Sequence, residues 1–161
     1  MVGKLSHLIR SFKYVFYFYV PIFLLAFIYF YPYHDMNLWM AVLIILGGNL
    51  FLGLFTQTSN YIIEKYSDQG IIRDYLYHNF VHAFFRSLAG LSEIVLYAVF
   101  LALGFDSLVG GYLLLKTVSI WQGDYNNKKE WLHTAILRSA IVMALLVGLA
   151  ASYYLKIFIN S

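Results

Sequence analysis

The chain consists of long apolar stretches separated by short polar segments, and almost all of its charge lies at the edges of these stretches. An α-helix needs about 20 apolar residues to cross the hydrocarbon core of a bilayer, which is ~30 Å thick. We therefore predict an all-α fold, a polytopic transmembrane helix bundle that forms one domain over residues 1–161 and has almost no part outside the membrane. Five spans are predicted, at residues 14–31, 38–58, 84–103, 107–121 and 134–158.

The third and fourth spans come from a single apolar stretch, residues 84–121. As one helix this stretch would be about 57 Å long at 1.5 Å per residue, far more than a bilayer requires. Gly104 can end one helix, and Asp106 or Ser107 can cap the next. We therefore predict a break here, with a four-span chain as the alternative.

The longest polar stretch, residues 57–83, mixes charged residues with isoleucine, tyrosine and leucine. This pattern is typical of helical pieces that lie at the membrane interface. The alternative is that helices of the second and third spans extend into it.

Composition agrees with a membrane location, because 61% of the residues are hydrophobic, 12% are charged and the mean hydropathy is +0.70. The formal net charge of +3 would suggest nucleic acid as a partner of a soluble protein. Here the basic residues border apolar spans, which they anchor and orient, so we expect no nucleic-acid partner. The absence of cysteine excludes disulfides, thiol catalysis and cysteine-ligated clusters.

The lysines and arginines predict the orientation of the chain. In the five-span arrangement one side holds Lys4, Arg10, Lys13, Lys65, Arg73, Arg86, Lys128 and Lys129. The turns on the opposite side hold Asp35 and Asp106 but no lysine or arginine, and Lys156 near the C-terminus is the exception to the pattern. The positive-inside rule then places the N-terminus in the cytoplasm and the C-terminus outside, in a bacterial inner membrane or another membrane that faces the cytoplasm.

Three ionisable residues, Glu93, Lys116 and Arg138, fall inside predicted spans at similar depths. A charge within a membrane is costly unless it is paired or hydrated. We expect Glu93 to pair with Lys116, with Arg138 or with both, and Asn49 to join this intramembrane polar cluster. We favour an ion pair that locks helices together over an ion path, a proton path or a pocket for a lipid headgroup.

The third span carries a polar stripe. At 100° per residue its members fall within about 40° of one line, with His78 nearby. The members are Tyr75, His82, Arg86, Glu93 and Tyr97. The stripe would line a hydrated groove or form the face that packs against neighbouring helices.

The histidines are weak candidates for metal ligands. His78 and His82 have the i, i+4 spacing at which two imidazoles can share a metal, with His133 as a third ligand. His82 and His133 could alternatively be axial ligands of a haem. All three lie near the predicted interface, where amphipathic side chains are ordinary, so we expect no cofactor.

No nucleophile elbow, phosphate loop or dinucleotide fingerprint is found, so an enzymatic role is not favoured. Glycines at 47, 48, 53, 110 and 111 would allow helices to approach closely. The leading hypothesis is a membrane subunit, a scaffold, sensor or anchor, that forms a homo-oligomer or binds a partner protein through its cytoplasmic loops, beside anionic lipid headgroups. A small channel or transporter built around the polar cluster is the alternative, and a haem- or metal-binding membrane protein is the third.

Overall fold

The computed structural model describes residues 19–33, 35–66, 80–123 and 130–161, and the regular structure in these ranges is entirely helical. A first helix, Tyr19–Phe30, is followed by a 3-10 turn, η1. The bounds of the later elements are η1 Tyr31–Tyr33, α2 Met36–Tyr66, α4 Phe80–Ala102, α5 Asp106–Gly123 and α6 Glu130–Asn160. The all-α prediction is confirmed for the described residues, while residues 14–18 of the first predicted span lie outside them.

Two of these helices are long and apolar enough to cross a membrane. They are Met36–Thr56 within α2, with a mean hydropathy of 2.2, and Ala135–Asn160 within α6, with a mean hydropathy of 2.1. The first helix and Ser87–Ala102 of α4 are apolar but shorter. Within the described ranges, length and composition therefore qualify two helices as membrane spans, whereas the sequence pattern predicts five.

The predicted break between the third and fourth spans is confirmed. Gly104 adopts a φ of 79°, a left-handed conformation that favours glycine. Phe105 N donates to Phe100 O at 2.8 Å and Gly104 N donates to Leu101 O at 3.2 Å, the two bonds of a Schellman motif. α5 then begins at Asp106, so this carboxylate lies in the first turn of the helix rather than before it.

The start of α2 is fixed by Asp35. Its Oδ1 accepts hydrogen bonds from Asn37 N at 2.7 Å and from Leu38 N at 3.0 Å, so Asp35 is the N-cap of the helix. α2 continues to Tyr66, past the predicted end at residue 58, and α4 begins at Phe80. Where residues 57–83 are described, they are therefore extensions of the flanking helices, and residues 67–79 lie outside the described ranges.

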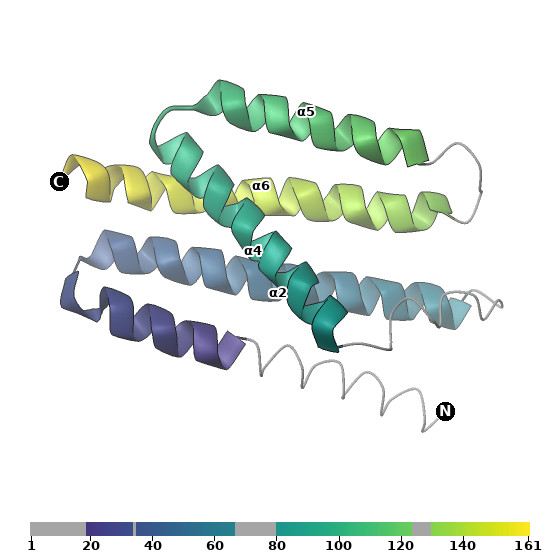
Figure 1. Cartoon of the computed structure of the whole chain (residues 1–161), viewed down its shortest axis with the longest axis horizontal. Helices are drawn as coiled ribbons and strands as arrows, with labels where there is room; N and C mark the ends of the chain where they lie inside the picture. Colours follow the sequence, from purple (N-terminus) through teal and green to yellow (C-terminus); the bar gives the residue numbers. More distant parts are fainter. Residues whose placement is uncertain (1–18, 34, 67–79, 124–129) are drawn as a thin grey trace.

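Three helices form the centre of the fold. α2 and α6 run antiparallel beside each other, and α4 crosses and contacts both obliquely (Figure 1). Each helix contributes one glycine to a close contact with another of the three. Gly48 of α2 lies against Val147 of α6, Gly148 of α6 against Tyr97 of α4, and Gly90 of α4 against Asn49 of α2. The absence of a side chain at these points lets the helices approach closely where they cross.

The other glycines singled out by the sequence have no such contact. A Cβ atom built on Gly47, Gly53, Gly110 or Gly111 would meet no atom of the described residues within 4 Å. Successive helical positions point about 100° apart, so only one of two adjacent glycines can face a given neighbour. The prediction of close approach thus holds for Gly48 within the described part of this chain, and for these four a close approach to another chain stays a prediction.

The first helix and α5 lie at opposite edges of the three-helix centre (Figure 1). The first helix packs on α2 through the buried Tyr19, with Leu50 and Leu54 on the other side of the contact. α5 packs on α4, and the buried Val109 joins the central cluster around Ile94. Each edge helix therefore buries one face and leaves the rest of its surface exposed.

Candidate polar site between α4 and α5

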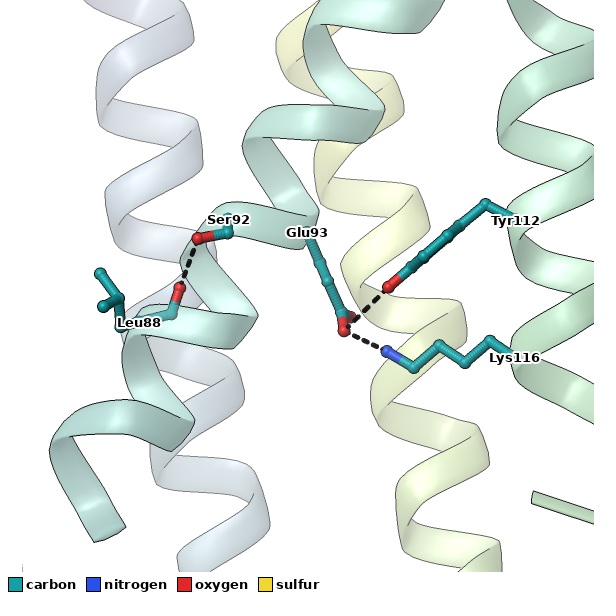
Figure 2. A network of polar contacts seen from close by, with 5 residues as sticks. All are labelled: Leu88, Ser92, Glu93, Tyr112 and Lys116. Carbon is teal, nitrogen blue, oxygen red and sulfur yellow. Dashed lines mark hydrogen bonds and ion pairs between the residues drawn. The ribbon is translucent and has the colours of Figure 1, made fainter. Parts of the chain in front are cut away.

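Glu93 of α4 and Lys116 of α5 form an ion pair between the two helices, in which Lys116 Nζ donates to Glu93 Oε1 (Figure 2). The Glu93 side chain is 23% exposed and the Lys116 side chain 24%. Both side chains are thus about three-quarters buried. The structure brings together these two residues of the predicted cluster, because α5 turns back along α4 after the break at Gly104.

Tyr112 is a third member of this network. Its hydroxyl donates to Glu93 Oε1 in a long hydrogen bond of 3.4 Å, and Lys116 Nζ lies 5.9 Å from the centroid of its ring (Figure 2). Tyr112 and Lys116 are four residues apart, so they occupy the same face of α5. Tyr112 was not among the residues predicted for the cluster, although its spacing of four from Lys116 is a sequence signal that indicates it.

Tyr97 lies one helical turn after Glu93 and is fully buried, with 0% of its surface exposed. Its ring meets the Tyr112 ring edge-on, with centroids 6.0 Å apart and an interplanar angle of 63°. Its other side lies against Gly148 of α6. Among the described residues, the Tyr97 hydroxyl has no hydrogen-bond partner. The polar site therefore contains one buried donor that the surrounding helices do not satisfy.

Asn49 of α2 makes a different contact from the one expected of it. Its Nδ2 donates to the backbone oxygen of Ser87 at 3.2 Å, and the residue is only 3% exposed. Ser87 lies six residues before Glu93 in α4. Asn49 therefore bonds α2 to the backbone of α4. In the described structure Glu93 instead accepts hydrogen bonds from Tyr112 and Lys116.

Arg138, the other cationic residue predicted to pair with Glu93, lies in α6 with an exposed side chain. In the described part of the chain, the ion pair of Glu93 is the one with Lys116. Of the two predicted pairings, the structure therefore contains the one between α4 and α5.

The remaining predicted site residues lie where the structure does not describe their side chains. Tyr75 and His78 fall outside the described ranges. His82 and Arg86 belong to α4 and His133 belongs to α6, but only their backbone is described. The polar stripe beyond Glu93 and Tyr97, and the histidine site for a metal or haem, therefore stay predictions.

The chemistry of the network is that of a matched pair. One carboxylate faces one ammonium group, and Tyr112 donates to the same carboxylate oxygen, so the charges neutralise each other. An ion pair in apolar surroundings persists only when both partners are held in place, and separating them is costly. The pair therefore fastens α5 to α4.

Comparison with known proteins found no relative of the chain, since no protein-family model, no curated protein and no solved structure matches it.

Proposed function

We propose that this protein is an integral membrane protein, and the observation that carries the proposal is the exposure of its apolar helices. Within the described residues, only 33% of the apolar window of α2 and 22% of that of α6 are buried. A core helix of a soluble protein would be mostly buried, and soluble proteins rarely expose large apolar patches. Leu25, Leu115 and Leu146, on three different helices, are each at least 60% exposed. Lipid would cover this surface.

We further propose five spans, with the N-terminus in the cytoplasm and the C-terminus outside. The turn after the first helix, the turn between α4 and α5, and the C-terminus lie toward one end of the molecule, at the left in Figure 1. The ends of α2 and α5 and the start of α6 lie toward the other end. This alternation supports the assignment made from the lysines and arginines of the sequence. A tilted α4 and a short α5, bonded to each other by Glu93 and Lys116, would share the membrane with the two longer spans.

The function supported best is that of a non-enzymatic membrane subunit, a scaffold or anchor for a partner protein or for further copies of the chain. The Glu93 carboxylate pairs with the Lys116 ammonium across two helices, which favours a structural contact over an ion path. Outside the three-helix centre, Gly110 and Gly111 of α5 are exposed and open. Such small residues permit close packing of a further helix. The basic loops predicted on the cytoplasmic side supply a second place for a partner or anionic headgroups.

The test is the mass of the native particle extracted in mild detergent, measured with its absorption spectrum. We expect a defined oligomer or a complex with a second protein, and no colour. A strict monomer with no co-purifying protein would contradict the subunit proposal. A Soret band would instead identify haem, and ion flux through liposomes containing the pure protein would favour the channel alternative.

Paired glycine variants make this test specific to α5. Gly110→Leu and Gly111→Leu place a large side chain on the exposed face of α5. On α2, Gly47→Leu does the same at an exposed position and Gly53→Leu at a half-buried one. A Cβ atom added at any of the four positions meets no described atom within 4 Å, so all four variants are expected to fold. If α5 is the packing surface, the first two variants reduce the particle mass and the α2 variants leave it unchanged. If all four variants form particles of the same mass, the partner binds at another surface.

A further inference from the structure

Two polar atoms at the α4–α5 site make no hydrogen bond to the described residues, although the groups beside them are bonded. The Tyr97 hydroxyl is buried and, among the described residues, has no hydrogen-bond partner. Both hydrogen bonds given for Glu93 in the described structure end on Oε1, from Tyr112 and from Lys116. Glu93 Oε2 therefore has acceptor capacity that these helices do not use. The site thus combines a buried donor that has no partner among the described residues with a partly exposed carboxylate that has one oxygen free to accept.

The two groups lie on one face of the same helix. Glu93 and Tyr97 are four residues apart in α4, a spacing that stacks side chains one turn above the other. The Tyr97 ring contacts Tyr112, the residue that donates to Glu93. Tyr97 and Glu93 thus belong to one polar site bounded by α4, α5 and, through Gly148, α6.

We propose that this site binds a water molecule that bridges Tyr97 and Glu93. The Tyr97 hydroxyl donates to the water oxygen, and the water donates to Glu93 Oε2. Buried waters in proteins characteristically join two to four polar groups that would otherwise be unsatisfied. A phenol left in apolar surroundings without a partner is destabilising, so the bridge satisfies a group that would otherwise weaken the fold.

The bridge would extend the ion pair into a chain of hydrogen bonds from Lys116 through Glu93 and the water to Tyr97. The ionised carboxylate would then have donors on both oxygens, which stabilises its charge at a position that we place inside the membrane. This inference is independent of the subunit proposal, since it concerns contacts within one chain and holds for a monomer or an oligomer alike.

The first test is the sign of the stability change in Tyr97→Phe, which removes one hydroxyl and keeps the ring. If the hydroxyl bonds a water, the variant loses that bond and its Tm falls by about 2–4 °C in detergent or nanodiscs. If the hydroxyl has no partner, its removal leaves the Tm unchanged or raises it, and the proposal is overturned. Tyr153→Phe is the matched control, because this tyrosine of α6 is 65% exposed and the same change there should leave the Tm unchanged.

The second test detects the water directly and does not depend on how stable the variant is. Infrared spectra of the protein are recorded in ordinary water and in water labelled with oxygen-18, which shifts the bands of water but not those of tyrosine. We expect the wild type to show an isotope-sensitive band of a bound water that is lost in Tyr97→Phe and retained in Tyr153→Phe. If Tyr97→Phe keeps every isotope-sensitive water band of the wild type, the proposal is overturned. A Tyr97-dependent change in a lipid ester carbonyl band would also overturn it, by identifying lipid as the acceptor.

Discussion

Gly148 of α6 lies so close to Tyr97 of α4 that a β-carbon at position 148 would be 2.5 Å from the β-carbon of Tyr97. This contact sets the distance between α4 and α6 at their crossing. It also closes one side of Tyr97, whose opposite neighbour is the Tyr112 ring of α5. The arrangement of the polar site therefore depends on a glycine that carries no polar group itself.

Gly148→Ala is predicted to destabilise the protein by about 1–3 kcal/mol, the usual cost of overpacking. The atom that it meets is the β-carbon of Tyr97, which cannot move unless the helix backbone moves. Gly47→Ala is the control, because an added Cβ there meets nothing within 4 Å of the described structure and alanine favours a helix by up to about 1 kcal/mol. Thermal unfolding in detergent measures both. Equal stability of the two variants would show that α4 and α6 are not held this closely.

Glu93 and Lys116 are predicted to depend on each other for stability. Glu93→Ala removes the carboxylate that the Lys116 ammonium faces, and Lys116→Ala removes the ammonium that the carboxylate faces. Each change is expected to cost less than the roughly 3–5 kcal/mol of a fully buried pair, because each side chain is about a quarter exposed. The double variant should be more stable than the sum of the single changes implies. Strict additivity in this double-mutant cycle would mean that the two side chains do not interact.

Asn49 and Gly90 are predicted to be coupled in the same manner. A β-carbon at position 90 would lie 3.0 Å from Asn49 Oδ1, so Gly90→Ala requires Asn49 to shift and strains its bond to Ser87 O. Asn49→Ala alone should cost about 1 kcal/mol through the lost hydrogen bond. In that background Gly90→Ala should be neutral or stabilising, since the obstructing oxygen is gone. If Gly90→Ala is equally harmful with and without Asn49, the contact is not the cause.

The proposed topology predicts which positions are reachable from outside the cell. The chain has no cysteine, so single cysteines can be introduced at Asp35, Asp106, Lys128 and Ser161 without a background signal. An impermeant thiol reagent applied to intact cells should label positions 35, 106 and 161 and leave position 128 unlabelled until the membrane is opened. Labelling at position 128 together with protection at position 106 would contradict the five-span topology.

The sequence by itself determined the break between α4 and α5, because the signal for this break is local. Gly104 is the residue that can adopt a positive φ between two apolar stretches, and the chain turns there as predicted. The apolar lengths of α2 and α6 were likewise readable, since hydropathy is a property of consecutive residues. The sequence also marked Glu93 as a residue in need of a cationic partner, because an isolated charge in an apolar stretch is costly.

The tertiary structure decided which face of each helix meets which neighbour. The sequence predicted Lys116 and Arg138 equally as ion-pair partners of Glu93, and the structure places Lys116 beside it. The sequence likewise predicted Gly47 and Gly48 equally as points of close contact with a neighbouring helix, and in the structure Gly48 faces Val147. In a chain this apolar, hydrophobic periodicity hardly distinguishes an inner from an outer face, because side chains that face lipid and side chains that face helices are chemically alike. The rotation of each helix about its axis is therefore fixed by shape at the crossings and by the few polar contacts, which only the assembled fold contains.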